Sequence, residues 1–481
     1  MSAEEIIVTD HNAVFIKIAC SQGLAYEMSE YFSFMAPNAK HDKRVRQKLW
    51  DGKIRLFNLR SRLLHSGLFE EVQRFAKQFG YRVIDNRKDQ CNQKVTDEQI
   101  AIFLKHLQLP EDRQPRDYQL TGLREAASKK RVMLLSPTSS GKSLLIYMIC
   151  RWFNKKTLVI VPTTTLVKQM AGDFYSYNYD QEVSQILAGA SKENLNKITV
   201  STWQSIYNMP AEWLQQFDVI IGDEAHGFKA NSLKTIMENS NATVRVGTTG
   251  TLDDMKVNEL TIQGLFGPIK KLITTKELID RGQVANVQIY AYDLQYPDDV
   301  RKAARKEKPE YDQELNFLYS FDKRSRFVFA LVQRLSGNKM ILFKKVSHGQ
   351  AMYEHLKAIY PNVHIVYGEI DTDTRNEIRA LTEESNDAII VASYKTFGTG
   401  ISIVNLQHVL LAASIKSKIT LIQAIGRALR RGGEKVRACV HDIGDNLSIG
   451  QYVNYTYRHF LGRLELYTKE QLPFKYVRIQ L

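Results

Sequence analysis

The stretch VMLLSPTSSGKSLLIYMI, residues 132–149, decides the fold of this chain. Its apolar run Val132–Leu135 leads into small polar residues, then Gly141-Lys142-Ser143, then a longer apolar run. A strand, a loop and a helix in this order point backbone N–H groups and a helix N-terminus at a phosphate. Lys142 can neutralise the β- and γ-phosphates of ATP, and the Ser143 hydroxyl can ligate Mg²⁺. The stretch therefore predicts an α/β domain that binds ATP and Mg²⁺. The residues expected around the phosphates are Pro137, Thr138, Ser139, Ser140, Gly141, Lys142 and Ser143.

Two adjacent acids supply the second half of the predicted ATP site. The segment Asp-Glu-Ala-His at 223–226 directly follows the apolar run Asp218–Ile221. At the carboxyl end of a buried strand, Asp223 can hold the metal, and Glu224 can orient and deprotonate the attacking water. The alternative is a solvated turn, but a phosphate loop upstream favours the catalytic interpretation. The predicted metal ligands are Ser143 and Asp223.

Short β-branched runs alternate with longer helical patterns twice along the chain, which is typical of parallel strands with crossover helices. In the first half the runs are Val132–Leu135, Leu158–Val161, Ile198–Ser201, Asp218–Ile221 and Thr243–Gly247. In the second half they are Met340–Phe343, His364–Tyr367, Ala388–Ala392, His408–Ala412 and Ala438–Asp442. We predict an α/β protein with two parallel-sheet lobes and a small N-terminal α+β accessory domain. The expected parts are residues 1–105, lobe 1 at 106–280, lobe 2 at 281–450, and a helical tail at 451–481 packed on lobe 2. The charged stretch Arg301–Lys308 is expected between the lobes, as a helix or a connector.

The bulk properties fit a cytoplasmic protein with a polyanionic partner. The chain has 481 residues, more than the roughly 250–300 that one hydrophobic core supports. Its net charge is +14, which favours nucleic acid through counterion release, although a basic surface kept for solubility is the alternative. No apolar run approaches the ~18 residues of a membrane span, so we expect no membrane association. The four cysteines lack metal-like spacing and are expected to be reduced thiols.

Six further segments follow in an order that matches a known class of motor. They are Arg116-Asp117-Tyr118-Gln119, Val161–Gln169, Ser201-Thr202-Trp203-Gln204, Thr249-Gly250-Thr251, Gly398–Ile401 and Gln423–Arg430. Together with the phosphate loop and the Asp-Glu-Ala-His segment, they resemble superfamily 2 helicases over about residues 110–445. The resemblance implies two RecA-like lobes, an adenine contact through Gln119 and a nucleotide contact at Gly400. It also implies coupling of hydrolysis to movement through His226, Thr249, Gly250, Thr251 and Gln423.

Arg427 and Arg430 are the predicted arginine fingers of the second lobe. Two arginines three residues apart on a helix lie on one face. A guanidinium is a planar, permanently charged fork that suits phosphate oxygens. The alternative is an ordinary solvated arginine pair, but the position after a second α/β lobe favours the finger role. With ATP on lobe 1 and the arginines on lobe 2, each hydrolysis cycle would close and open the two lobes.

The motif positions also predict contacts to a nucleic-acid backbone, which position a strand without reading its sequence. The alternative for each residue is an ordinary polar loop position. The candidates are Thr163, Thr165, Lys168, Thr202 and Trp203 in lobe 1, with Lys344, Ser347 and Thr399 in lobe 2.

A second resemblance extends to the N-terminal region. The segments that carry it are Tyr31–Phe34, Trp50–Leu56, Leu64–Gly67, Ala392-Ser393-Tyr394, Thr399–Ser402 and Ser414–Ile419. They resemble phage helicases of recombination and repair. This implies action on stalled forks, four-way junctions and RNA–DNA hybrids in an infected bacterial cytoplasm. It also implies a monomer, with recombination or single-strand-binding proteins as candidate partners.

The basic stretch Lys40–Arg62 is the predicted junction-binding element, with nine Lys or Arg residues against two acids. Its bases can bind several phosphates, and Trp50 or Phe57 can stack on an unpaired base. The alternative is a solvated face whose aromatic side chains belong to the core, and for Trp50 alone the core is the favoured interpretation. The expected phosphate ligands are Lys43, Arg44, Arg46 and Lys48.

Two rival functions remain open on the sequence alone. A double-strand translocase that never separates strands would carry the same ATPase residues. A non-catalytic nucleic-acid scaffold with a helicase fold would not need them, so the intact Lys142, Asp223, Glu224, Arg427 and Arg430 argue against it.

Overall fold

The computed structural model describes residues 4–36, 39–88, 94–187, 189–252, 255–399, 403, 405–428 and 437–481. The chain divides into two compact units, which are described here one at a time. The first consists of Met1–Ser136 and Gly141–Leu272, and the second of Pro137–Ser140 and Ile273–Leu481. Among the described residues, no helix is both long and apolar enough to cross a membrane.

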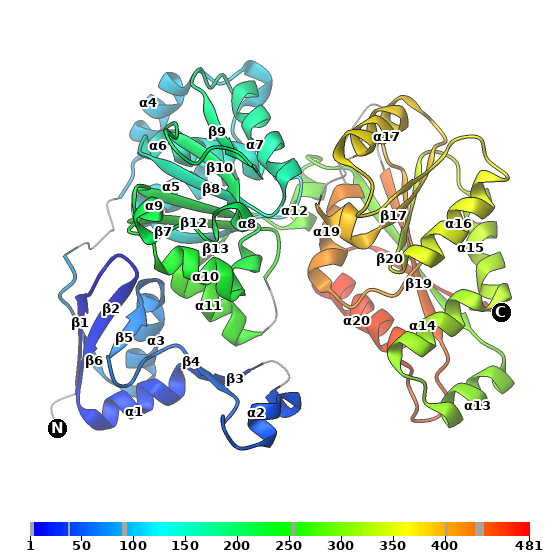
Figure 1. Cartoon of the computed structure of the whole chain (residues 1–481), viewed down its shortest axis with the longest axis horizontal. Coiled ribbons are helices and arrows are strands. Elements are labelled where there is room, and N and C mark those ends of the chain that lie inside the picture. Colours follow the sequence, from blue (N-terminus) through cyan, green and yellow to red (C-terminus); the bar gives the residue numbers. More distant parts are fainter. Residues whose placement is uncertain are drawn as a thin grey trace. The chain divides into compact units, whose positions relative to one another are not determined.

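The N-terminal domain of the first unit is a four-stranded sheet in the order β5-β2-β1-β6 (Figure 1). Its strands are β1 Glu5–Asp10, β2 Phe15–Ala19, β5 Leu63–His65 and β6 Arg82–Asp85. Alternate residues of β1 and β2, such as Ile6 and Ile16, are buried, as expected for a sheet with one covered face. Helices α1 Gln22–Tyr31 and α3 Phe69–Phe79 supply the other side of this core. The predicted small α+β domain is therefore confirmed.

An arm extends from this domain between α1 and β5. It is made of the antiparallel pair β3 Ser33–Met35 and β4 Lys53–Arg55, with helix α2 Lys43–Arg46 between them (Figure 1). Leu49 beside α2 is 76% exposed, so the arm has little core of its own. We call residues 33–55 the arm.

Lobe 1 is a seven-stranded sheet in the order β13-β7-β12-β11-β8-β10-β9, with every pair parallel. The strands are β7 Arg131–Leu135, β8 Thr157–Val161, β9 Val183–Ile186, β10 Ile198–Thr202, β11 Val219–Asp223, β12 Val244–Thr249 and β13 Ile269–Lys271. One face packs on α5 Asp117–Lys129, α6 Lys142–Phe153 and α7 Thr164–Ser176. The other packs on α8 Trp203–Ile206, α9 Ala211–Gln215, α10 Asn231–Glu238 and α11 Lys256–Phe266. Helix α4 Asp97–Leu107 precedes α5.

Lobe 2 is a second seven-stranded parallel sheet, in the order β16-β17-β15-β18-β19-β14-β20. The strands are β14 Asn286–Gln295, β15 Lys339–Phe343, β16 Val363–Val366, β17 Ile389–Ser393, β18 His408–Leu411, β19 Arg437–Asn446 and β20 Phe474–Gln480. The helices of this unit are α12 Thr275–Asp280, α13 Asp298–Glu307, α14 Tyr311–Ser320, α15 Asp322–Arg334, α16 Val346–Lys357, α17 Thr372–Glu384, α18 Tyr394–Thr399, α19 Lys418–Ala428 and α20 Tyr455–Lys469. The predicted pair of parallel-sheet lobes is confirmed.

Two expectations about lobe 2 need correction. The charged stretch 301–308 forms a helix over most of its length, which is one of the two expected alternatives, but it does not lie between the lobes, because this helix, α13, follows β14, the first strand of lobe 2. The tail after residue 450 is not only helical. After α20 it forms β20, which pairs in parallel with β14 and extends the lobe 2 sheet.

The N-terminal domain shares packing with lobe 1 inside the first unit. Leu260 of α11 is 1% exposed and belongs to the hydrophobic core of the N-terminal domain. Gly67 lies against the end of α11, where a Cβ atom would stand 2.1 Å from the Gln263 carbonyl oxygen. His65 is buried, and its Nε2 atom lies 2.8 Å from Oε1 of Glu238 in α10. These contacts join the domain to the two helices α10 and α11.

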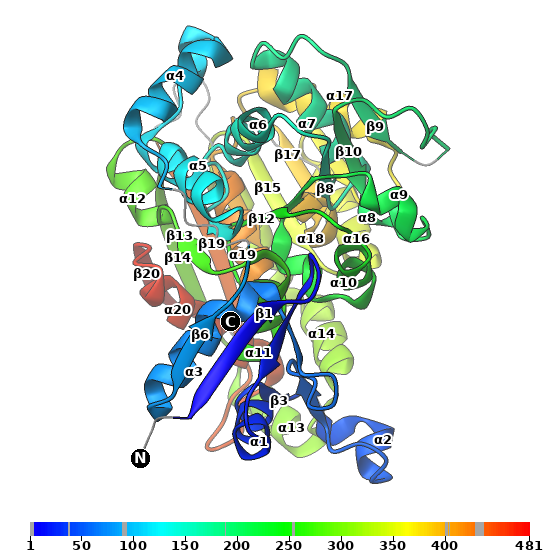
Figure 2. The same ribbon diagram turned by 90° about the vertical axis from the view of Figure 1, so that its left-hand side faces the viewer.

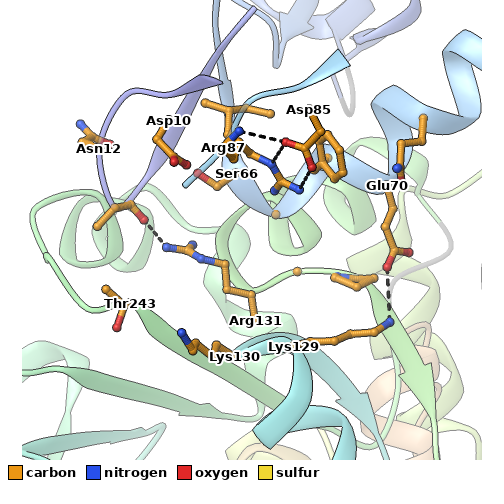
Figure 3. A pocket seen from close by; sticks show the side chains of 17 residues that line it. Asp10, Asn12, Ser66, Glu70, Asp85, Arg87, Lys129, Lys130, Arg131 and Thr243 are labelled. Atoms are coloured by element: carbon orange, nitrogen blue, oxygen red, sulfur yellow. Dashed lines mark hydrogen bonds and ion pairs between the residues drawn. The ribbon is translucent and has the colours of Figure 1, made fainter. Parts of the chain in front are cut away.

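A polar cavity of about 430 Å³ lies beside this contact surface (Figure 3). The Arg131 guanidinium donates to the Ala13 carbonyl across it, and Lys129 pairs with Glu70 at 3.3 Å. On the N-terminal side Arg87 and Asp85 form a two-bonded ion pair at 2.8 and 2.9 Å. Figure 2 shows β1 and β6 side by side in this domain.

Candidate nucleotide and nucleic-acid sites

The phosphate loop lies where the sequence predicts it, between β7 and α6. Helix α6 begins at Lys142, and Gly141 before it has a φ of 79°, a left-handed conformation that favours glycine. The Gln119 amide donates to the Gly141 carbonyl at 2.8 Å and accepts from the Arg116 N–H at 2.8 Å. A Cβ atom on residue 141 would stand 2.6 Å from Nε2 of Gln119. Gln119, predicted to contact adenine, is therefore buried against the loop and shapes it.

Lys142 and the acid pair come together across the sheet edge. Nζ of Lys142 lies 3.3 Å from Oε1 of Glu224, and Nδ1 of His226 lies 3.3 Å from Oε2 of the same carboxylate. Glu224 has a φ of 49°, a left-handed backbone conformation that is uncommon for a residue with a side chain. Burial raises the pKa of the Glu224 carboxyl, but Lys142 and His226 outweigh burial and hold this pKa well below its usual range.

Asp223 has the opposite electrostatic environment. It ends β11, is 9% exposed, and accepts a hydrogen bond from the Thr248 hydroxyl at 2.8 Å. Burial and the adjacent negative charge of Glu224 raise the pKa of the Asp223 carboxyl. A carboxylate in this situation is stabilised by a nearby cation.

The oxygen donors at this edge fit Mg²⁺ held jointly with nucleotide phosphates. Oγ of Ser143 lies in the first turn of α6, 2.9 Å from the Tyr177 hydroxyl. Mg²⁺ prefers oxygen ligands and is usually bound by one or two protein groups together with substrate phosphates. In the parts of the chain that the structure describes, no cluster of three or more His, Cys, Asp or Glu side chains could hold a metal alone.

The segment Thr249-Gly250-Thr251 joins this acid pair to the end of β12. The Thr249 hydroxyl lies 3.0 Å from Nδ1 of His226 and 3.4 Å from Oε2 of Glu224, and it donates to the Thr251 carbonyl at 3.0 Å. The Thr249 carbonyl also accepts from the Ser136 N–H at 2.8 Å, which ties the segment to the start of the phosphate loop. Gly250 is partly exposed beside them.

The lobe 1 candidates for backbone contacts differ in exposure. Thr163 caps α7 by accepting from the Leu166 N–H at 3.4 Å, and Lys168 on the same helix is exposed. Thr165 is half-buried between them. Thr202 is only 3% exposed, with its hydroxyl 3.0 Å from that of Ser205. The structure therefore gives no support to a phosphate contact through Thr202. Trp203 is half-buried and packs on the core of lobe 1.

The described lobe 2 candidates lie on three helices, α16, α18 and α19, and on the loop after β15. Lys344 is exposed, and its ammonium lies 4.3 Å above the Tyr311 ring, while Ser347 is exposed at the start of α16. Gln423 and Arg427 are one turn apart on α19, and the Arg427 guanidinium lies 5.7 Å from the Phe397 ring centre. Thr399 ends α18. Gly400 and Arg430 lie outside the described residues.

The arm carries the predicted basic ligands on its surface. Lys43, Arg44, Arg46 and Lys48 are all exposed. Arg44 pairs with Asp42 at 2.9 Å, and this hydrogen-bonded guanidinium lowers the pKa of the Asp42 carboxyl. The same guanidinium lies 4.9 Å from the Trp50 ring, whose N–H donates to the Lys53 carbonyl at 3.1 Å.

Phe57 corrects one expectation. It is fully buried in the core of the N-terminal domain, so it cannot stack on a base. Trp50 is only partly buried, so solvent can reach its ring.

Two buried ion pairs and one buried carboxylate of lobe 2 were not found from the sequence. Arg324 pairs with Asp445 at 2.7 Å, and Arg463 pairs with Asp442 at 2.7 Å. Glu314 of α14 is fully buried and accepts from the N–H groups of Tyr455 and Thr456 at the start of α20, at 2.9 and 2.8 Å. Their partners lie far along the chain, so no local spacing pattern predicts them.

The fold and the ATP site define a superfamily 2 helicase. Residues 112–254 match the family described as the res subunit of type III restriction enzymes, and residues 323–432 match the helicase conserved C-terminal domain. Residues 5–85 match the N-terminal domain of the DNA helicase UvsW. The chain is 35% identical over 504 residues to the ATP-dependent DNA helicase uvsW of Enterobacteria phage T4, covering 98% of this chain and 99% of that protein. The chain belongs to this UvsW family of ATP-dependent DNA helicases.

One solved structure agrees with this assignment, and a second shares the fold. The crystal structure of T4 UvsW is 32% identical, with 99% of both chains covered and a TM-score of 0.53. The type ISP restriction-modification enzyme LlaBIII, solved bound to DNA, has a TM-score of 0.57 over 76% of this chain. The matched region makes up 32% of that enzyme and is 16% identical in sequence, so it shows a likeness of fold alone.

Proposed function

We propose that this helicase uses ATP to unwind or remodel branched DNA, namely stalled forks, four-way junctions and R-loops. The observation that carries the proposal is a basic arm on a domain outside the two lobes. Two lobes suffice to track a strand, but tracking does not select a branch point. The likeness to the phage helicase extends through the arm-bearing domain, which supports a shared role for it.

In the proposed ATP site, Lys142 releases Glu224 when it turns to the β- and γ-phosphates. With its cation partner gone, the pKa of Glu224 rises toward that of a better base for the attacking water. Asp223 and Ser143 would hold Mg²⁺, which supplies charge neutralisation on the phosphates. Arg427 and Arg430 would complete the site as arginine fingers, with Gln119 near the adenine and Gly400 near the nucleotide.

Hydrolysis is proposed to drive movement through the residues around the acid pair. Loss of the γ-phosphate changes the charge that Glu224 and His226 face, and Thr249, Gly250 and Thr251 lie directly beside them. Gln423 would carry the matching role in lobe 2. Thr163, Thr165, Lys168, Trp203, Lys344, Ser347 and Thr399 remain the proposed backbone contacts.

The arm is proposed to bind the phosphates of a second duplex arm at a junction. Its exposed Lys43, Arg44, Arg46 and Lys48 each neutralise about one phosphate, and Trp50 can stack at an unpaired branch point. Exposed bases of this kind act through counterion release, so junction binding should depend steeply on salt.

The test is a charge reversal of Lys43, Arg44, Arg46 and Lys48 to Glu. Deleting residues 1–105 is a poorer test, because it would uncover Leu260 and the end of α11. The matched control reverses Lys17, Lys77, Arg82 and Lys88, four exposed bases of the same domain outside the arm, with the same change in net charge. Affinity for four-way junctions, forks and plain single strands is measured at several salt concentrations.

We expect the arm variant to weaken junction and fork binding more than single-strand binding. Its log–log salt slope on junctions should become shallower by about 0.7–0.9 for each phosphate that the variant no longer neutralises. ATP turnover without DNA should be unchanged. Equal weakening on junctions and single strands, or equal weakening in the control, would leave the arm only a general electrostatic role.

A double-strand translocase is the second candidate, and the match of residues 112–254 to a restriction-enzyme subunit favours it. Strand-displacement assays on forked and blunt duplexes decide between the two. ATP turnover on duplex DNA with no displaced strand would support translocation alone.

The proposed setting is the cytoplasm of an infected bacterium, with RNA–DNA hybrids as further substrates and recombination or single-strand-binding proteins as partners.

A further inference from the structure

A basic and aromatic surface lies on lobe 2. It includes Lys344, already a candidate backbone contact, and it adds residues of α20 that have no role in the sites described above. Two adjoining hollows of about 450 and 490 Å³ share the residues Lys416, Ser417, Tyr455 and His459. They are lined by residues of α14, α18, α20 and the start of α19, by the loop that precedes α19, and by Lys344 after β15. Pockets of this size hold one drug-sized ligand, which is also the size of one nucleotide. We call this surface the α20 hollow.

The charged side chains of the α20 hollow are all positive. Among the described residues that line it there is no Asp or Glu. Lys344, Lys416, Lys418 and Arg458 are exposed around it, whereas Arg463 at its base is buried against Asp442. His459 is neutral at physiological pH, because burial and then the cations Arg463, Lys416, Lys344 and Arg458 lower its pKa to about 4. The hollow therefore suits a polyanion.

Two tyrosines supply ring faces in the same place. Tyr311 and Tyr455 meet edge to face, with ring centres 6.2 Å apart, and Tyr455 is 40% exposed. The Lys344 ammonium lies 4.3 Å above Tyr311, and the Arg458 guanidinium lies 5.3 Å from the Tyr455 ring centre. Aromatic rings interleaved with cations are typical of surfaces that bind a single strand by stacking and charge.

Hydrogen bonds hold the residues of the α20 hollow in place, so little free energy is lost in ordering them when a ligand binds. Glu314 fixes the start of α20, which carries Tyr455, onto α14, which carries Tyr311. The hydroxyl oxygen of Ser414, in the loop before α19, lies 3.0 Å from Nδ1 of His459. The Tyr394 hydroxyl donates a hydrogen bond to the Ala413 carbonyl of the same loop at 2.7 Å.

We infer that the α20 hollow binds one unpaired nucleotide of a nucleic-acid strand, with its base stacked on Tyr455 and its flanking phosphates on Lys416 and Arg458. This rests on the proposed function only in taking the ligand to be a nucleic-acid strand, and it requires neither branched DNA nor ATP turnover. An acidic protein segment would use the cations but would have little use for the exposed ring, which is why a nucleotide is favoured.

The test compares oligo(dT) with an abasic backbone of the same length, without nucleotide, on the full chain. Tyr455→Ala should weaken oligo(dT) binding about 5- to 100-fold, the value of one base stack, and abasic binding less than about twofold. Tyr455→Phe keeps the ring and should bind like the parent chain. Lys416→Ala should weaken both ligands equally and make the log–log salt slope shallower by about 0.7. Lys302→Ala, an exposed lysine of α13, is the charge control and should change neither.

Three outcomes would overturn the inference. Tyr455→Ala could weaken both ligands equally, which would point to a structural role for the ring. It could weaken neither, which would place the strand elsewhere. Binding of a polyglutamate peptide could be abolished in Lys416→Ala while oligo(dT) binding is kept, which would identify an acidic protein as the ligand. A parent chain with no preference for junctions would contradict the proposed function but leave this test intact.

Discussion

Nδ1 of His226 lies 3.0 Å from the hydroxyl oxygen of Thr249, and both atoms lie within 3.4 Å of the Glu224 carboxylate. The residue proposed to activate water is therefore bonded to the segment that ends β12 and leads toward α11. A change in the charge around Glu224 is felt first by these two side chains.

Replacing Thr249 with Ala should separate hydrolysis from movement. The variant loses the hydroxyl that joins His226 to the Thr251 carbonyl, while Lys142, Asp223 and Glu224 stay in place. We expect DNA-dependent ATP turnover within about tenfold of the parent and strand displacement reduced much further. Thr249→Ser keeps the hydroxyl and should restore displacement. Parallel loss of both activities would contradict a coupling role.

Glu224→Gln should bind ATP but hydrolyse it about 10²–10⁴ times more slowly, because an amide cannot accept the proton of the attacking water. Lys142 would keep a polar partner at 3.3 Å, so the loop should hold its shape. A nucleotide-binding isotherm and a single-turnover assay measure the two effects. Turnover near the parent rate would show that another group is the base.

Arg427→Ala should lower kcat with saturating DNA by about 10³ while nucleotide affinity changes little. Arginine fingers act on the charge that develops during phosphoryl transfer, and Arg427 belongs to the lobe that lacks the phosphate-loop helix. Arg427→Lys keeps the charge but not the planar fork and should rescue poorly. A loss below tenfold would remove Arg427 from the finger role.

Leu260→Ala should loosen the N-terminal domain from lobe 1. The side chain is 1% exposed in the core of that domain, and emptying such a position costs about 2–5 kcal/mol. Hydrogen exchange should rise in β1, β2 and α3, whereas DNA-free ATP turnover should persist. Ile102→Ala, an exposed apolar residue of α4, is the control. Unchanged exchange in the N-terminal domain would mean that α11 does not hold it.

The stability of lobe 2 should fall as the pH drops below 6.5. His441 is 2% exposed, and its Nε2 atom lies 3.1 Å from Nδ1 of His408. Burial, and to a smaller extent the nearby His408, lowers the pKa of His441 from 6.5 to about 3. Below pH 6.5 His441 is protonated in the unfolded chain but stays neutral in the folded one. Unfolding is therefore favoured increasingly down to about pH 3. Between pH 6.5 and 5 this costs about 2 kcal/mol.

His441→Gln should remove that share of the pH dependence, although it lowers stability at neutral pH. Denaturant melts of the parent and the variant at pH 7.5, 6 and 5 give the comparison. His106→Gln, at an exposed position of α4, should leave the pH dependence unchanged. An equal loss of stability in the parent and in His441→Gln would show that other groups carry the effect.

Buried parallel strands were predictable because they are continuous apolar runs. The run Leu158–Val161 lies in β8, whose residues are all buried, and Ile198–Ser201 lies in β10. The strands that the sequence did not reveal follow other patterns. β14 alternates polar and apolar residues, and β20 carries Lys475 and Arg478 at the sheet edge.

The site was predictable as far as its motifs are local. The positions of Lys142, Asp223 and Glu224 follow from spacing within single segments, but the contact of Lys142 with Glu224 depends on strand order. The burial of Phe57 depends on packing against α1 and α3, which no local pattern gives. Arg324 and Asp445 are 121 residues apart, and only the folded sheet brings them together.

The place of Leu260 has a consequence for the evolution of such enzymes. A boundary drawn after β6 would separate the N-terminal domain from a side chain that completes its core. A gene exchange that moved only residues 5–88 into another helicase would transfer a domain with a cavity in its core. The remaining part of the donor would expose Leu260 to water. A transfer that keeps this core filled therefore has to include α11, so the unit that packs together is larger than the domain that the sequence delimits.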